Sequence, residues 1–397
     1  MSTKTRDSNL LSIMCAVFAV LWAGGFAFQP ARMPSDHVTK ALTDLERQVG
    51  QTIVIGFNGQ SVHDASVRTI SDQLHNGTIG GVILLGRNIQ SPAQVHQLVG
   101  DLTNHVDPTP FISVDQEGGA VQRLQPRKGF PRWPSAAEFA ENTGGCAGSN
   151  AQEQYATLAR GLRALGINLN FGPVVDLNIN LDNPIIGHLG RSYSDKSETV
   201  SRCGGMFISA HHAVNILTSL KHFPGHGSSK QDSHTVLPDI TDVWQPEELV
   251  PFQQLAQTRH ADMIMMAHLV HPDFSDAPGT PASMSRKATR QARAIAGQTT
   301  ILITDDLEMD AISSRMTVEQ AAIAAIAAGN DMIIASSYGR NDPNLGRRIN
   351  QAIVRAVMSG RIPKDQIHRS YERIRAAKAR LTNGSTPSSV TPSEPNA

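Results

Sequence analysis

Short apolar runs alternate with longer amphipathic stretches along most of this chain. Both faces of these runs are apolar, as in parallel strands that helices cover on both sides. The runs are Thr52–Phe57, Gly81–Leu85, Phe111–Val114, Asn168–Phe171, Ser219–His222, Met263–Ala267, Thr300–Thr304 and Asp331–Ala335. Helical patterns between them cover Ala151–Leu165, Val200–Ala213 and Val318–Ala328. The alternation predicts an α/β fold, and eight strand units predict closure into a single (β/α)8-like TIM barrel.

Polar and ionisable side chains collect at the ends of several of these runs. They are Asp115, Gln116, Glu117, Lys221, His222, His268, Asp305 and Asp306. Active sites of such barrels lie at the C-terminal ends of the strands, so we expect these side chains to share one rim. Any one of them could be a helix cap or a solvated charge. Their joint placement instead predicts an active site.

The two ends of the chain differ from its body. Two basic residues precede the apolar run Leu10–Trp22 and small residues follow it, which predicts a signal peptide or an N-terminal anchor over residues 1–30. The run is short for a membrane span, which needs about 20 apolar residues. Residues 383–397 are rich in Ser, Thr and Pro and are expected to be a disordered tail. We therefore expect a catalytic domain over residues 38–381 of an exported, periplasmic or secreted protein.

Charge and cysteine content narrow the class of protein. The 397 residues include 35 basic and 35 acidic ones. This balance argues against a nucleic-acid binder, which needs a basic excess to neutralise phosphates. Cys146 and Cys203 lie outside the N-terminal segment, and an oxidising compartment would permit a disulfide between them. Two separate buried thiols fit the sequence equally well, because it does not give their distance.

The segment from Lys221 to His234 carries three histidines on a loop interrupted by proline and glycine. Zinc binding by His222, His226 and His234 is one interpretation, but the spacings of four and eight residues match no common zinc pattern. Acid–base chemistry is the alternative. Asp232 lies two residues before His234 and can orient its ring and raise its basicity. We therefore predict that neither a metal nor an organic cofactor is required.

Two adjacent carboxylates, Asp305 and Asp306, follow the run Thr300–Thr304. Successive side chains of an extended strand point to opposite faces, so the two residues should have different roles. A carboxylate that points into the barrel mouth can act as a nucleophile at a sugar carbon. We assign that role to Asp305 and expect Asp306 to cap the following helix.

Four motifs have a combined order that is more specific than any one of them. They are Val114–Gly119, Lys221–Gly227, Asp232–His234 and Thr304–Met309. Together they resemble glycoside hydrolase family 3, and more narrowly its single-domain bacterial β-N-acetylglucosaminidase (β-N-acetylhexosaminidase) branch. The resemblance implies a retaining exo-enzyme that hydrolyses terminal N-acetyl-β-glucosaminides from peptidoglycan fragments or chitin-derived sugars.

The same resemblance implies a role for each matching residue. Asp305 matches the nucleophile, His234 the general acid/base and Asp232 its partner. The residues implied to hydrogen-bond the sugar hydroxyls are Asp115, Arg123, Arg191, Lys221 and His222. The implied partner is a small carbohydrate, with no nucleic acid and no obligate protein partner.

Other functions fit the same residues. A phosphorylase would use phosphate in place of water, and an imidazole acid/base repels an anionic nucleophile less than a second carboxylate would. A catalytically silent sugar-binding barrel would be free to lose Asp305, but this chain keeps Asp305 together with Asp232 and His234. A β-glucosidase of the same family is not expected, because that branch usually has a sandwich domain that supplies the acid/base.

Overall fold

The structure is a computed structural model that describes residues 36–148, 150–258, 261–337 and 342–382. The chain forms two compact units, Met1–Thr43 and Asp44–Ala397. Helix α2 (Asp36–Gln51) crosses the boundary between them, and the barrel and candidate site lie in the second unit. The predicted signal segment, 1–30, and the predicted tail, 383–397, are outside the described residues. No helix within the described ranges is long and apolar enough to cross a membrane.

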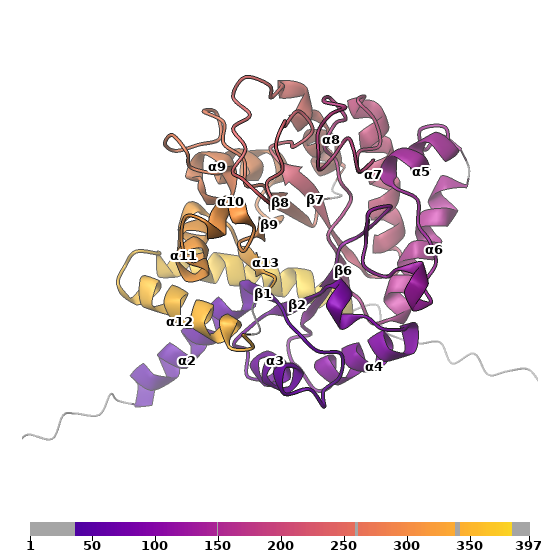
Figure 1. Ribbon diagram of the computed structural model, residues 1–397. Helices are drawn as coiled ribbons and strands as arrows, with labels where there is room; N and C mark the ends of the chain where they lie inside the picture. The colour runs from indigo at the N-terminus through magenta and orange to yellow at the C-terminus, as the bar shows by residue number, and fades with distance from the viewer. Residues whose placement is uncertain (1–35, 149, 259–260, 338–341, 383–397) are drawn as a thin grey trace, which may run out of the picture. The chain divides into compact units, whose positions relative to one another are not determined.

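Within the described residues, eight parallel strands close into a barrel in the order β1-β10-β9-β8-β7-β6-β3-β2 (Figure 1). They are β1 (Ile53–Gly56), β2 (Gly81–Leu84), β3 (Phe111–Val114), β6 (Leu169–Asn170), β7 (Leu217–Phe223), β8 (Met263–Met266), β9 (Ile301–Asp306) and β10 (Met332–Ala335). Each predicted run contains or overlaps one of these strands, so the predicted TIM barrel is confirmed. The first and last strands complete the ring, with Val54 paired to Ile334.

Helices connect the strands and surround them (Figure 1). They are α3 (Ala65–His75), α4 (Pro92–Thr103), α5 (Ala136–Asn142), α6 (Ala151–Ala164), α7 (Ser197–His212), α8 (Val250–Gln257), α9 (Arg286–Ala296), α10 (Asp310–Ser313), α11 (Val318–Ala328), α12 (Leu345–Met358) and α13 (Lys364–Thr382). The three helical patterns in the sequence correspond to α6, α7 and α11. Thr317 begins α11 with a capping box to Gln320, and Gly329 ends it in the left-handed conformation (φ +112°).

The core has two layers because alternate strand residues point to opposite sides. Val54 belongs to the cluster inside the barrel, whereas Ile53 and Ile55 belong to the cluster beneath the helices. The inner cluster also includes three apolar residues of α13: Ile374, Ala377 and Leu381. Nζ of Lys378 donates to the carbonyl oxygen of Gly80, just before β2, at 2.7 Å. Helix α13 therefore closes the barrel at the N-terminal ends of its strands.

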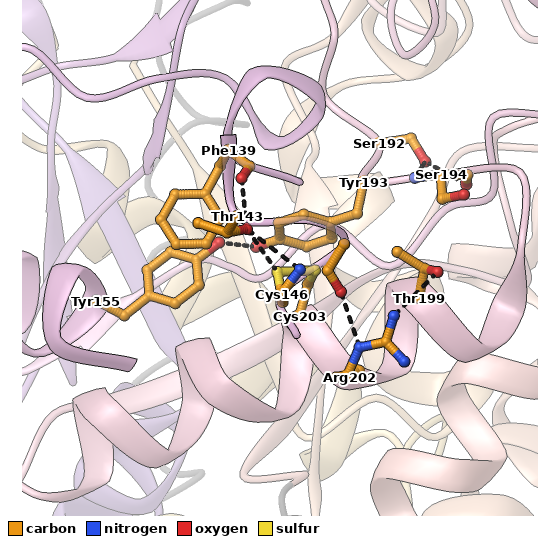
Figure 2. The surroundings of a disulfide bond; sticks show 11 residues. Phe139, Thr143, Cys146, Tyr155, Ser192, Tyr193, Ser194, Thr199, Arg202 and Cys203 are labelled. Atoms are coloured by element: carbon orange, nitrogen blue, oxygen red, sulfur yellow. Dashed lines mark hydrogen bonds between the residues drawn. A yellow bond between two sulfur atoms is a disulfide. The ribbon is translucent and has the colours of Figure 1, made fainter. Parts of the chain in front are cut away.

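A disulfide joins Cys146, which follows α5, to Cys203 in α7 (Figure 2). Their Cα atoms are 5.3 Å apart, so of the two alternatives left open by the sequence the structure contains the bond. Next to it, the hydroxyl group of Tyr155 donates to that of Tyr193 at 2.8 Å. The disulfide thus fixes α7 to the segment that precedes α6.

Candidate active site

A cavity of about 640 Å³ opens at the C-terminal ends of the strands. Its lining includes four of the predicted site residues: Asp115, Arg123, His234 and Asp305. Asp115 directly follows β3 and Asp305 is in the last two residues of β9, as expected for a barrel active site. The other four predicted residues, Asp232, Arg191, Lys221 and His222, lie outside this lining. The structure therefore divides the predicted residues into a lining set and a supporting set.

Asp305 is held as a partly buried anion. Its Oδ1 accepts the backbone N–H of Asp306 at 2.8 Å. Burial alone would raise the pKa of Asp305, but the nearby imidazoles of His222, His268 and His234 lower it to about 2. A carboxylate with this pKa is ionised at neutral pH, which a nucleophile requires.

The prediction that Asp306 caps the following helix is wrong. Helix α10 has Met309 as its N-cap residue, without a side-chain capping bond. Oδ1 of Asp306 instead accepts the backbone N–H groups of Ser336, at 3.0 Å, and Glu308, at 3.1 Å. Asp306 thus connects the end of β9 to the residue after β10. Its neighbour Asp305 remains free to face the cavity.

His234 and Asp232 form a pair at the cavity. Nδ1 of His234 lies 2.8 Å from Oδ1 of Asp232, which also accepts the backbone N–H of His234 at 2.8 Å. A carboxylate can only accept, so Nδ1 carries the proton of this bond. Nε2 of His234 is then the nitrogen available for chemistry. This geometry lets Asp232 orient the ring, and its role in the reaction stays a prediction.

Lys221 is buried between two carboxylates. Its Nζ lies 2.9 Å from Oδ1 of Asp115 and 2.6 Å from Oε1 of Glu117. Burial alone would lower the pKa of Lys221, but the two carboxylates raise it above its usual value. Burial would likewise raise the pKa of Asp115, and the charges of Lys221 and Arg123 lower it instead. Asp115 therefore faces the cavity as an anion that can accept a hydrogen bond from a hydroxyl group.

Arg191 and His222 form the next part of this network. Arg191 donates from Nε and Nη2 to the two carboxylate oxygens of Glu117, at 2.8 and 2.9 Å. Its Nη2 also lies 3.3 Å from Nε2 of His222. Nδ1 of His222 lies 2.7 Å from Oδ2 of Asp176, and its backbone N–H donates to Oδ1 at 3.0 Å. The ring of His222 is thus held between the carboxylate of Asp176 and the guanidinium group of Arg191.

Three residues of this site had no role in the sequence-based assignment. Glu117 pairs with both Lys221 and Arg191, although only its position in the acidic motif was noted. Asp176 binds His222 and follows the short apolar pair Val174-Val175, a signal that could have identified it. His268 donates from Nε2 to the carbonyl oxygen of Asp306 at 2.9 Å, which positions the end of β9.

The described residues contain no group of three or more His, Cys, Asp or Glu side chains arranged to hold a metal ion. The three histidines of the loop have separate partners. His222 contacts Asp176, His226 contacts Ser233 and His234 contacts Asp232. Their geometry is that of a hydrogen-bond network, and the independence from metals predicted above remains a prediction.

Comparison with known proteins places this site in a known context. The profile of the glycosyl hydrolase family 3 N terminal domain matches residues 42–377. β-Hexosaminidase A of Pseudoalteromonas piscicida is 30% identical over 392 residues, covering 88% of this chain and 64% of that protein. A β-hexosaminidase of Tolumonas auensis is 36% identical over 276 residues, covering 68% of this chain and 79% of that protein.

Solved structures of β-N-acetylglucosaminidases and β-N-acetylhexosaminidases are also similar to this chain. A family 3 β-N-acetylglucosaminidase from Paenibacillus sp. str. FPU-7 has a TM-score of 0.77 and 33% identity, covering 88% of this chain and 64% of that one. A β-N-acetylhexosaminidase from Beutenbergia cavernae has a TM-score of 0.72 and 25% identity, covering 84% and 98%. The chain thus spans about two thirds of some relatives and nearly all of another. Since the family profile covers most of its residues, this chain belongs to glycoside hydrolase family 3.

Proposed function

We propose that this protein is a retaining exo-β-N-acetylglucosaminidase that acts on peptidoglycan fragments or chitin-derived sugars. One observation carries the proposal. The carboxylate anion of Asp305 and the imidazole of His234 line the same cavity, and Asp232 holds the ring of His234. The relatives named β-hexosaminidase and β-N-acetylglucosaminidase support an N-acetylhexosaminide as the substrate.

The first step breaks the glycosidic bond. An oxygen of Asp305 attacks the anomeric carbon and forms a glycosyl ester. The protonated ring of His234 gives the proton on Nε2 to the departing oxygen. Asp232 keeps the proton on Nδ1, so the ring that remains is the neutral tautomer with a free lone pair on Nε2.

The second step releases the sugar. Nε2 of His234 now accepts a proton from water, which attacks the anomeric carbon and breaks the bond to Asp305. Two displacements at one carbon give net retention of configuration. Asp115, Arg123 and the supporting Lys221 would hold the sugar hydroxyls so that the anomeric carbon faces Asp305.

Activity on paired substrates tests the proposal. The purified protein should hydrolyse p-nitrophenyl N-acetyl-β-glucosaminide much faster than p-nitrophenyl β-glucoside. Proton NMR during the first turnovers should show the β-anomer of N-acetylglucosamine as the initial product. An α-anomer as the first product, or no cleavage of either glycoside, would contradict it.

The same assay decides between water and phosphate as the acceptor. Reactions run with and without inorganic phosphate should give free N-acetylglucosamine at the same rate. Formation of N-acetylglucosamine 1-phosphate would identify the enzyme as a phosphorylase.

We also propose that the protein works outside the cytoplasm. The basic and apolar pattern of residues 1–30 supports export, and so does the Cys146–Cys203 disulfide, because such bonds persist in oxidising compartments. Cell fractionation followed by mass spectrometry of the N-terminus tests this proposal. Exclusive recovery of the uncleaved, reduced chain from the cytoplasm would contradict it.

A further inference from the structure

Ser233 is the buried residue of the segment that carries the acid/base pair. The side chains of Asp232 and His234 are 27% and 56% exposed, whereas Ser233, between them, is 2% exposed. A segment whose outer residues face solvent has few contacts to hold it in place. The contacts of Ser233 therefore help to set the position of the His234 ring.

In the part of the chain that the structure describes, the side chain of Ser233 has a hydrogen-bond partner that can fix it, His226. Nε2 of His226 lies 3.0 Å from Oγ of Ser233, and His226 is itself buried. Nδ1 of His226 has no hydrogen-bond partner among the described residues. An orphaned buried N–H is rarer in proteins than an under-satisfied acceptor. The proton of His226 is therefore on Nε2, which donates to Ser233.

The backbone of His226 is fixed at both its polar groups. Its N–H donates to Oδ1 of Asp176 at 2.8 Å, and its carbonyl oxygen accepts from Nδ2 of Asn183 at 2.7 Å. Asp176 is the same carboxylate that binds both the backbone and the ring of His222. One buried carboxylate thus connects the sugar-binding side of the site to His226.

We infer that His226 is a positioning residue, which holds Ser233 and through it the Asp232–His234 pair at the cavity. The inference rests on the proposed function, because it gives His226 a purpose only if His234 is the acid/base. Burial and the neighbouring His222 lower the pKa of His226 to about 4, so the ring stays neutral at neutral pH. It acts through geometry and takes no part in proton transfer.

A second contact, to the main chain, holds the same segment. The backbone N–H of Asp310, in the first turn of α10, donates to the carbonyl oxygen of His234 at 3.2 Å. This contact involves the main chain and survives any side-chain substitution in the segment. Loss of the bond between His226 and Ser233 would remove the buried side-chain anchor of this segment and let the ring of His234 move away from the leaving group.

The variant Ser233→Ala removes this bond by deleting one oxygen atom. We expect kcat/KM for N,N′-diacetylchitobiose to fall about 10- to 100-fold, since misplacing a catalytic group can cost that much. For a dinitrophenyl N-acetyl-β-glucosaminide, kcat/KM should fall less than about 3-fold, because that leaving group departs without an acid. Ser233→Thr keeps the hydroxyl group and should restore most of the chitobiose activity.

Two controls separate positioning from a general loss of structure. Ser370→Ala removes an equally buried serine hydroxyl, which donates to Oδ1 of Asp331 at 2.7 Å. This variant should lower kcat/KM equally for the two substrates or for neither. In a His234→Ala background, Ser233→Ala should cause no further loss on chitobiose, because effects that act through one residue do not add.

Several outcomes would overturn the inference. Equal losses of the Ser233→Ala variant on the two substrates, or additive losses with His234→Ala, would make Ser233 merely structural. If Ser233→Ala does not fold, His226→Asn must show the same substrate dependence, because its shorter amide leaves Ser233 without the bond. Failure of the proposed function is distinguishable, because the wild-type protein would then cleave neither substrate.

Discussion

Each end of the barrel buries a lysine, and the two lysines have opposite surroundings. At the C-terminal ends of the strands, Lys221 pairs with Asp115 and Glu117, and these carboxylates raise its pKa against the effect of burial. At the N-terminal ends, Lys378 donates to Oε1 of Gln51 and to a backbone carbonyl group, and its Nζ lies 4.8 Å from the centre of the Phe111 ring. Burial lowers the pKa of Lys378 to about 7.

The difference shows what kind of perturbation marks a functional site. Lys378 is strongly perturbed by burial alone, and it belongs to the end of the barrel that α13 closes. The pKa of Lys221 is raised by the carboxylates of Asp115 and Glu117, and Asp115 lines the cavity. A charge network next to a cavity, rather than a large pKa shift, is therefore the feature that marks the candidate active end.

The largest expected effect is at the active end. Asp305→Ala should lower kcat by about 10⁴-fold or more, because the covalent route is lost. The folded structure should persist, since the carboxylate accepts one backbone N–H that water can replace. Steady-state kinetics with circular dichroism checks both parts. As a matched control, Asp306→Asn keeps an acceptor oxygen for Ser336 and should be far milder; near-normal turnover of Asp305→Ala would remove its assignment as nucleophile.

Replacing the paired lysine should affect both activity and stability. Lys221→Met leaves Asp115 and Glu117 buried without their shared cation. Breaking a buried pair in this way costs about 3 kcal/mol or more of unfolding free energy. We expect kcat/KM to fall about 100-fold with it, because Asp115 loses its position and charge balance. Urea unfolding and kinetics would measure the two losses, and an unchanged kcat/KM would exclude Lys221 from substrate positioning.

Lys378, which forms no salt bridge with a described carboxylate, should affect how the free energy of unfolding depends on pH. The pKa of Lys378 is about 7 in the folded protein against an ordinary value of 10.5. Between these pH values the unfolded chain binds more protons, so the free energy of unfolding should rise with pH by up to about 1.4 kcal/mol per unit. Below pH 7 this contribution should level off. Urea titrations of the wild-type protein and Lys378→Met from pH 6 to 10 would measure the difference, and identical slopes would contradict the assignment.

The smallest effect should be that of Lys378→Met on activity. Methionine fills a similar volume and removes the buried charge, but Gln51 and the carbonyl group of Gly80 lose their donor. These two effects oppose each other, so the free energy of unfolding at pH 7 should change little. Because Lys378 lies at the closed end, kcat/KM should stay within about 2-fold of the wild-type value. A large loss of kcat/KM in the folded variant would mean that the two ends are coupled and would weaken the comparison.

The arrangement of the strands could be predicted because each is a short run that is apolar on both faces. The hairpin of β4 (Gln116–Gly118) and β5 (Val121–Gln122) was missed, since strands of two or three residues have no readable periodicity. The disulfide could not be decided either. Its formation depends on the distance between Cys146 and Cys203, which packing of α7 against the preceding segment determines.

The residues of the predicted rim lie at or just after strand ends, and three of them, Asp115, Asp305 and Asp306, line the cavity. Their supporting residues were harder to find. Asp176 contacts His222 across 46 positions of sequence, and no local pattern encodes such a contact. Asp306 was misassigned because an Asp beside a helix start resembles a cap, whereas its actual partner, Ser336, belongs to another strand end.

The pairing of β1 with β10 has a consequence for the timing of synthesis. The ribosome makes β1 near the start of the chain and β10 only after all the other barrel strands. Until then, the growing sheet has two open edges, one at β1 and one at the strand made last, and exposed strand edges invite pairing with other chains. Translation at about 5–20 residues per second makes this interval many seconds long. The barrel can therefore close only after its last strand emerges, so its vulnerable period is set by the length of the chain.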